Sequence, residues 1–169
     1  KTVYQSKFFQ VNQNTIERDG KTFTKDFIKR NPTVLVIPYA EDNQIYMEKQ
    51  FRDARNDYCL EVVSGNMDTA SSPLENAKRE LAEEIGLTAK TWKQIATWEL
   101  SVSMDAKMYL FAATDLEETE TNLDMDEEIE AVKMPLSDVV TKIDSGEMYC
   151  ASHIAAILLF KKMREEGKL

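Results

Sequence analysis

The sequence predicts an α/β (α+β) domain, a mixed sheet packed between helices, with an antiparallel β extension at its N-terminal end. Three observations support this fold class. Segments rich in β-branched and aromatic residues recur over the first 113 residues, an amphipathic helix interrupts them, and a second amphipathic helix follows near the end of the sequence. A chain of 169 residues corresponds to about one domain with a sizeable core.

Residues 1–31 are predicted to form the β extension. Asp19-Gly20 lies between two strand-like segments and is typical of a tight hairpin turn. A ribbon of two or three strands is only marginally stable alone, so it must pack on the following domain or on a second subunit. Residues 32–169 are predicted to form the main domain.

The main domain is predicted to alternate strands with helices. Strands are expected at residues 33–38, 44–51, 92–98, 107–113 and 129–134. Helices are expected at residues 73–85, at about 135–146, and from residue 151 onward.

The stretch 65–87 organises the domain. Ser71 or Ser72 can cap a helix whose first turn accommodates Pro73, and Gly86 ends it because glycine enters the left-handed conformation at little cost. Apolar residues at helical spacing form one stripe, at Leu74, Ala77, Leu81 and Ile85.

Glu80, Glu83 and Glu84 project from one flank of this helix, and Arg79 can pair with Glu83 at a spacing of four residues. Three carboxylates this close repel one another, and a hard divalent cation such as Mg²⁺ would offset the repulsion. A solvated acidic helix face is the alternative, because surface helices are rich in Glu. The cluster alone does not decide between these interpretations.

The spacing of the fixed positions resembles the Nudix box, the loop–helix–loop signature of hydrolases that act on a nucleoside diphosphate linked to another moiety. The matching positions are Gly65 and the run Arg79-Glu80-Leu81-x-Glu83-Glu84-x-Gly86-Leu87. The first Glu of the family pattern, which helps hold the loop and the metal site together, corresponds to Ser71 here.

This resemblance implies a Nudix-type sheet sandwiched between helices and Mg²⁺-dependent chemistry, with Mn²⁺ as a possible substitute. The implied metal ligands are Glu80, Glu83, Glu84 and the backbone carbonyl of Ser64. Glu83 would also help activate water. The implied structural positions of the box are Gly65, Arg79 and Gly86, with Arg79 orienting the glutamates by ion pairing.

Two segments resemble the ADP-ribose pyrophosphatase branch of the family. The run from Glu48 to Arg52 is similar to its R-Q-Y-R segment, and the run from Glu61 to Gly65 is similar to E-x-P-A-G. Arg52 is therefore a candidate for binding a substrate phosphate, or else a surface arginine that closes a strand. Glu61 is a candidate for a substrate contact or for a structural ion pair.

The acidic run at residues 115–130 is expected to be mostly a solvated loop. Relatives carry a catalytic Glu on a mobile loop here, and Asp126, Glu127 and Glu128 are the matching positions, with Glu127 the expected catalytic base. In the loop 101–106, this chain lacks the Ser-Pro-Gly segment and the following Glu of ADP-ribose-cleaving relatives. That departure favours another nucleoside diphosphate derivative over ADP-ribose itself.

Composition limits the partners. The net charge of −9 would repel a phosphate backbone, so nucleic acid is not an expected partner. Two cysteines, the absence of a charged-then-apolar leader and the absence of an apolar run near eighteen residues predict a cytoplasmic protein without a membrane span. The pyrophosphatase branch commonly dimerises through such an N-terminal sheet, so a homodimer is expected by resemblance.

The predicted function is Mg²⁺-dependent hydrolysis of the pyrophosphate linkage in a nucleoside diphosphate derivative of the ADP-ribose or nucleotide-sugar type. Its products would be a nucleoside monophosphate and a sugar phosphate. Two alternatives remain open at this point: a non-catalytic nucleotide-binding Nudix domain, and a Nudix enzyme for dinucleoside polyphosphates or nucleoside triphosphates. A single histidine, His153, leaves neither a zinc site nor a Ser-His-Asp triad plausible.

Overall fold

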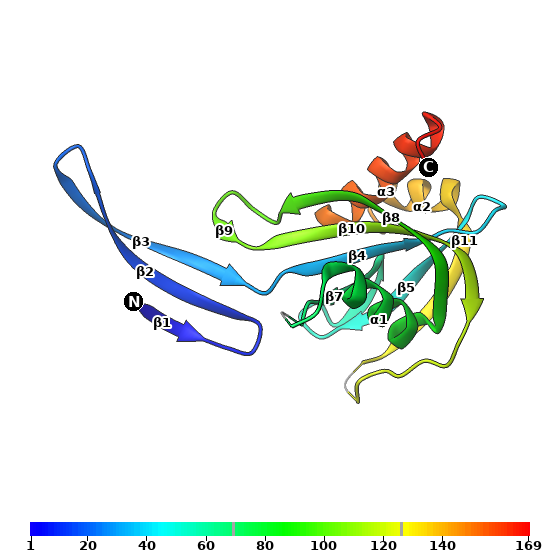
Figure 1. Cartoon of the computed structure of the whole chain (residues 1–169), viewed down its shortest axis with the longest axis horizontal. Coiled ribbons are helices and arrows are strands. Elements are labelled where there is room, and N and C mark those ends of the chain that lie inside the picture. The colour runs from blue at the N-terminus through cyan, green and yellow to red at the C-terminus, as the bar shows by residue number, and fades with distance from the viewer. Residues whose placement is uncertain (69, 126) are drawn as a thin grey trace.

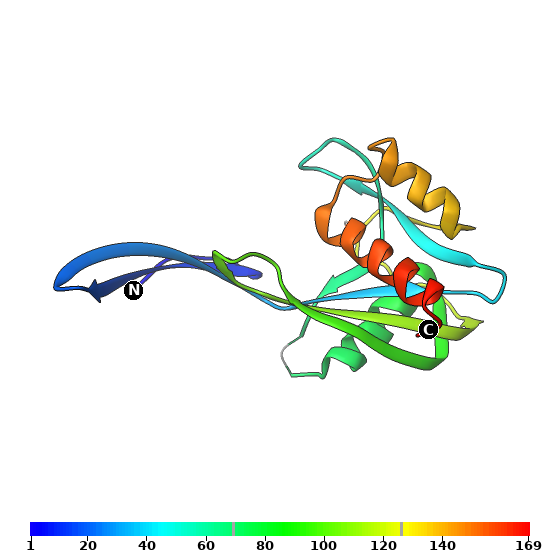
Figure 2. The same cartoon turned by 90° about the horizontal axis from the view of Figure 1, so that it is seen from above.

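A long β ribbon extends from one end of a body of sheets and helices (Figures 1 and 2). The computed structural model describes residues 1–68, 70–125 and 127–169. In this described part of the chain, no helix combines the length and the apolar character needed to cross a membrane.

The ribbon is an antiparallel sheet of the first three strands, β1 (Thr2–Gln5), β2 (Phe9–Arg18) and β3 (Lys21–Arg30). Asp19 and Gly20 both have positive φ, 52° and 69°, as a two-residue hairpin turn requires, so the predicted hairpin is confirmed. A short fourth strand, β9 (Met104–Asp105), pairs in parallel with β3 and ties the ribbon to the body. The sequence did not predict this pairing.

The body contains two sheets instead of the single mixed sheet expected. The first has the strand order β7 (Val63–Asn66), β4 (Thr33–Pro38), β10 (Lys107–Glu118), β8 (Leu87–Glu99). It is mixed, because β10 runs parallel to β4 and antiparallel to β8. The second is antiparallel, with the order β11 (Ile129–Pro135), β5 (Gln44–Arg52), β6 (Asp57–Glu61).

Helices cover both faces of the mixed sheet, which confirms the predicted fold class (Figure 2). They are α1 (Pro73–Ile85), α2 (Leu136–Asp144) and α3 (Ala151–Glu165). Strand β4 alternates between two cores, as the period of two in a strand requires. Val34 and Val36 pack in one core with Leu81 of α1, whereas Leu35 and Ile37 pack in the other with residues of α2 and α3.

Helix α1 begins and ends as the sequence predicts. Ser72, not Ser71, is the N-cap, and it forms a reciprocal capping box with Glu75. Gly86 ends the helix in the left-handed conformation, with φ of 65°. The apolar stripe of α1 faces the mixed sheet, and this fixes the direction in which its acidic flank points.

Most of the described part of the acidic run at residues 115–130 lies outside helices and strands, as predicted, but its start belongs to a strand. Strand β10 continues to Glu118, because Leu116 and Glu117 stay in register with β8. Side-chain pairs across the strands support this extension, with Thr91 bonded to Asp115 and Lys90 paired with Glu117.

Alanine at position 86 should destabilise the fold more than alanine at position 146. Both glycines have positive φ, which should cost an alanine about 1–2 kcal/mol. A Cβ at position 146 would meet nothing, but at position 86 it would lie 2.9 Å from the carbonyl oxygen of Thr119. Gly86→Ala should therefore lose about 1–3 kcal/mol beyond the loss in Gly146→Ala, measured by urea unfolding. Equal losses would contradict the contact.

Candidate active site

The acidic flank of α1 is pressed against strand β7. The side chains of Glu80 and Glu84 are buried, with relative exposures of 7% and 6%. The carboxyl group of Glu80 lies so close to Gly65 that a Cβ there would be 2.0 Å from the carboxyl carbon. Gly65 is therefore required because the helix carboxylate occupies the space of a side chain.

Arg79 bridges two of the glutamates. Its Nη2 donates to Oε1 of Glu80 at 2.6 Å, and its Nη1 donates to Oε2 of Glu83 at 2.6 Å. The pair with Glu83 was expected from the spacing, and the pair with Glu80 was not. Burial raises the pKa of Glu80 above its usual value, although Arg79 opposes the shift.

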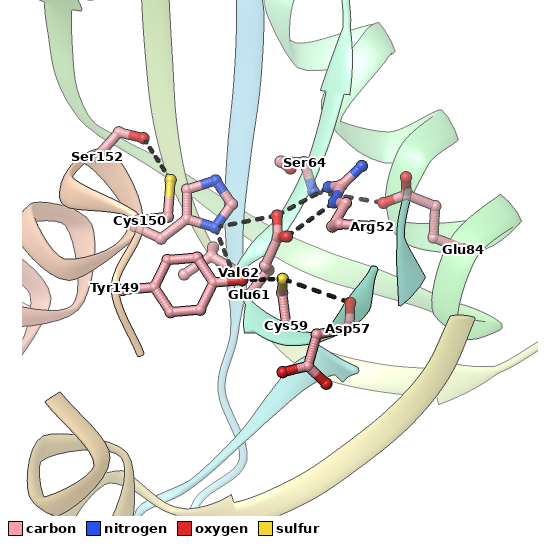
Figure 3. A network of polar contacts seen from close by, with 11 residues as sticks. Arg52, Asp57, Cys59, Glu61, Val62, Ser64, Glu84, Tyr149, Cys150 and Ser152 are labelled. Atoms are coloured by element: carbon pink, nitrogen blue, oxygen red, sulfur yellow. Dashed lines mark hydrogen bonds and ion pairs between the residues drawn. The ribbon is translucent and has the colours of Figure 1, made fainter. Parts of the chain in front are cut away.

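Glu84 accepts a hydrogen bond from the backbone N–H of Ser64 at 3.3 Å. Burial raises the pKa of Glu84 to about 7, and the charges of Glu80 and Glu127 act in the same direction. The Ser64 N–H and the neighbouring carboxyl of Glu48 partly offset this shift. Figure 3 shows Ser64 and Glu84 side by side, next to Arg52.

Glu48 is a member of this cluster that the sequence analysis did not assign. It lies in β5 and is fully buried, and burial together with Glu84 raises its pKa well above the usual value. The two carboxyl groups can hydrogen-bond only if one of them carries a proton, so when both are ionised the oxygens of Glu48 have no donor among the described residues. Period-two alternation could have revealed Glu48, because it shares a strand face with Gln50 and Arg52.

Arg52 and Glu61 form a two-pronged ion pair. Nε and Nη2 of Arg52 donate to the two carboxylate oxygens of Glu61, each at 2.8 Å. The Nδ1 atom of His153 accepts a hydrogen bond from the Val62 N–H at 3.1 Å and lies 3.7 Å from a carboxylate oxygen of Glu61. The side chain of Arg52 remains 39% exposed, so one end of the guanidinium still faces outward.

Glu80, Glu83, Glu84, Arg79 and Arg52 line a cavity of about 520 Å³. Its lining combines the box residues with Arg52, with the loop that follows β10 and with three residues of the N-terminal extension. The lining from outside the box is Lys7, Phe8, Asn31, Gln50, Arg52, Ser64, Asn122, Asp124 and Glu127.

The loop acid Glu127 faces this cavity. Its Oε2 accepts from the backbone N–H of Asp124 at 3.0 Å. Glu128 is held elsewhere, because its carboxylate is bonded to the hydroxyl of Tyr58. Asp126 lies outside the described residues.

The family model of the Nudix domain matches residues 29–151. The chain belongs to the Nudix family. It is 31% identical over 159 residues to the ADP-ribose pyrophosphatase of Bacillus subtilis (strain 168), covering 92% of this chain and 86% of that relative. It is 24% identical over 174 residues to the ADP compounds hydrolase NudE of Escherichia coli (strain K12), covering 99% and 92% of the two chains. These relatives confirm the resemblance to the ADP-ribose pyrophosphatase branch.

Among solved structures, a crystal structure of an ADP compounds hydrolase superposes with a TM-score of 0.84 at 22% identity. The match covers 100% of this chain and 94% of that one. It confirms the Nudix fold.

Asn76, which the sequence analysis did not identify, holds the loop of the Nudix box in place. Its Oδ1 accepts from the N–H of Asp68 at 2.9 Å, and its Nδ2 donates to the carbonyls of Asp68 and Ser72 at 3.2 and 3.0 Å. Arg79 also donates to its Oδ1, at 3.3 Å. A buried amide thus joins the loop to α1 in a box where Ser71 replaces the family's first Glu.

The donor set fits a hard divalent cation. Its groups are carboxylate oxygens, which Mg²⁺ and Mn²⁺ prefer, and those of Glu48 lack any donor. In the described ranges, however, no three acidic, His or Cys side chains already converge on one point as metal ligands would. Arg79 accounts for part of this, because it already bridges Glu80 and Glu83.

The metal-free protein should lose stability as pH rises, because of Glu84. Its folded pKa, about 7, lies above the usual 4.5, so the folded state holds the proton more tightly. This contribution is complete below about pH 4.5 and is lost as pH rises through 7, an effect of about 3 kcal/mol. Urea unfolding in EDTA at pH 5 and pH 8 should show a smaller loss for Glu84→Gln than for wild type. Parallel pH dependence in the two proteins would contradict the raised pKa.

Proposed function

We propose that this Nudix protein hydrolyses the pyrophosphate linkage of a nucleoside diphosphate derivative of the ADP-ribose or nucleotide-sugar type. The observation that carries the proposal is a buried glutamate cluster that opens into a cavity with basic side chains at its wall. The cavity volume of about 520 Å³ is within the range for sites that bind small ligands. The names of the two relatives, an ADP-ribose pyrophosphatase and an ADP compounds hydrolase, support this substrate class.

In this proposal, Mg²⁺, or Mn²⁺ in its place, is held by Glu80, Glu83, Glu84 and the carbonyl oxygen of Ser64. The cation would polarise phosphoryl oxygens and lower the pKa of a bound water.

The remaining groups position the substrate and move a proton. Glu127 at the cavity wall would accept the proton of the attacking water, with Glu83 assisting. The water oxygen bonds to one phosphorus, and the bridging P–O bond breaks, so that one phosphate leaves as a monoester. Arg52, held by Glu61 through Nε and Nη2, would present its remaining Nη1 to a phosphate oxygen.

The base of the nucleotide would contact the N-terminal extension. Phe8 lines the cavity and its side chain is exposed, so its ring can stack on a nucleobase. Lys7 lines the same cavity and adds a positive charge near the phosphates. The extension would thus complete the substrate site of the body.

Glu84→Gln should lower the Mg²⁺-dependent turnover of ADP-ribose or a nucleotide sugar by roughly 100-fold or more, because a ligand of the catalytic cation is lost. Glu130→Gln, the same change at an exposed position, should leave turnover unchanged. Chromatography of the products separates the substrate classes: a nucleoside monophosphate with a sugar phosphate supports the proposal.

Two nucleotides, or free pyrophosphate, would indicate a dinucleoside polyphosphate or a nucleoside triphosphate as the substrate. Nucleotide binding without turnover by the folded wild type would indicate a non-catalytic Nudix domain.

We also propose that residues 1–31 form a dimerisation element attached to a catalytic domain of residues 32–169. The ribbon exposes a group of large apolar side chains, and exposing so many of them to water is unfavourable unless a partner covers them. They are Val3, Tyr4, Phe8, Phe9, Phe23 and Phe27. Phe23 and Phe27 lie on one face of β3, and a second copy of the chain would cover them.

A double substitution on that face should produce a monomer. Sedimentation of the wild type should give about twice the mass of the Phe23→Ser/Phe27→Ser variant, because the apolar contact is removed. Thr22→Ala/Thr24→Ala, on the opposite face of β3, serves as the control and should stay dimeric. A monomeric wild type would contradict the proposal.

A cytoplasmic location fits the thiols. Cys59 and Cys150 are both free, as expected in a reducing compartment.

A further inference from the structure

The carboxyl group of Glu48 is a buried group that neither the Nudix box nor the packing of the fold explains. Its relative exposure is 0%, and neither of its oxygens accepts a hydrogen bond from a described residue. Buried polar atoms are nearly always hydrogen-bonded, and an unpaired buried carboxylate is costly. Unless it shares a proton with Glu84, an ionised Glu48 therefore requires a partner that the described residues do not supply.

The neighbours of Glu48 increase the need for a positive charge. Across the β5–β6 pair, Glu48 stands directly opposite Glu61, and like charges in this position are destabilising. The charge of Glu61 is already met by Arg52, which binds both of its oxygens. The other close neighbour is the carboxyl group of Glu84. Among the described residues, Glu48 therefore has acidic neighbours and no cationic partner in hydrogen-bond contact.

Packing alone would favour a different residue at this position. Glu48 follows the core residue Met47 and precedes the exposed Lys49, in a strand whose buried positions are otherwise filled by Ile45, Met47 and Gln50. An apolar side chain of similar size would fill the same volume without the cost of burying a charge. The use of the carboxylate must then lie in what it binds.

We propose that Glu48 is an additional carboxylate of the cation site, which holds a divalent cation jointly with Glu84. The inference rests on the proposed function, since it takes Glu84 as a ligand. The cation would supply the positive charge that Glu48 lacks and would sit at the inner end of the cavity, where β5 meets α1. The site would thereby extend beyond the box to a strand that precedes it in the sequence.

A carboxyl pair that shares one proton is the competing explanation, and one substitution separates the two. Glu48→Gln keeps the size of the side chain, and its amide can donate to Glu84 as a protonated carboxyl would. It removes only the negative charge. A structural proton-sharing role therefore survives this change, whereas a cation-binding role does not.

The experiment is a Mn²⁺ titration of the metal-free full chain without substrate. The concentration of free Mn²⁺ at each step is measured by electron paramagnetic resonance. Glu48→Gln should bind Mn²⁺ about tenfold or more weakly than wild type, because a carboxylate of the site is lost. Its metal-free unfolding midpoint should be equal to that of wild type or higher. Glu130→Gln, the same change at an exposed position in the neighbouring strand β11, should bind as wild type does.

Mn²⁺ affinity of Glu48→Gln within twofold of wild type would overturn the inference. If Glu84→Gln loses both Mn²⁺ binding and turnover while Glu48→Gln keeps both, the proposed function stands and this inference fails. Full turnover in Glu84→Gln would instead reject the proposed function. If Glu48→Gln does not fold, Glu48→Asp is used instead. This variant keeps the negative charge, but its side chain is shorter by one methylene. An Mn²⁺ affinity equal to that of wild type would count against the inference.

Discussion

The close approach of Glu80 to Gly65 is the constraint on which the rest of the site depends. Because the carboxyl group occupies the space of a missing side chain, α1 can lie directly against β7. The apolar stripe of the same helix is anchored in the core through Leu81, so the helix cannot rotate away from this contact. Core packing on one flank thus forces a group of acidic side chains on the other flank into a buried position, where their charges are costly.

The protein meets that cost in different ways for different glutamates. The single positive charge of Arg79 is shared by Glu80 and Glu83, whereas Glu61 has Arg52 to itself. Among the described residues, Glu84 accepts a hydrogen bond from the Ser64 N–H, and Glu48 accepts none. Negative charge is therefore left over at the Glu80–Glu83 pair and beside Glu48 and Glu84, so this cluster would attract a cation.

How much could be predicted from the sequence depended on whether the signal was local. The cap, the end at Gly86 and the hairpin at Asp19-Gly20 are each specified by a few adjacent residues. The last two were predicted, and the cap was predicted at Ser71 or Ser72 and found at Ser72. The parallel pairing of β9 with β3 joins segments more than seventy residues apart, and no local pattern encodes its register. Likewise, the division of the strands into two sheets depends on long-range pairing.

The residues of the candidate site also differ in whether a local sequence pattern could predict them. The positions Glu80, Glu83 and Glu84 follow from fixed spacing on one helix, whereas Asn76 and Glu48 act through contacts with other segments. Asn76 looked like an ordinary polar residue in the first turns of a helix, and its role needs the loop folded back against it. Glu48 looked like one more charge in a strand that also carries Lys49 and Arg52, and its contact with Glu84 of α1 joins residues far apart in the sequence.

The position of Glu48 also bears on the balance between stability and binding. A buried carboxylate that lacks a donor weakens the metal-free fold, and a cation that binds it restores the loss, so binding and folding are coupled. The ion pair of Arg52 with Glu61 limits this effect to one strand position, because the opposing carboxylate on β6 is already neutralised. The sheet therefore tolerates a pair of facing acids, of which Glu61 is paired with an arginine.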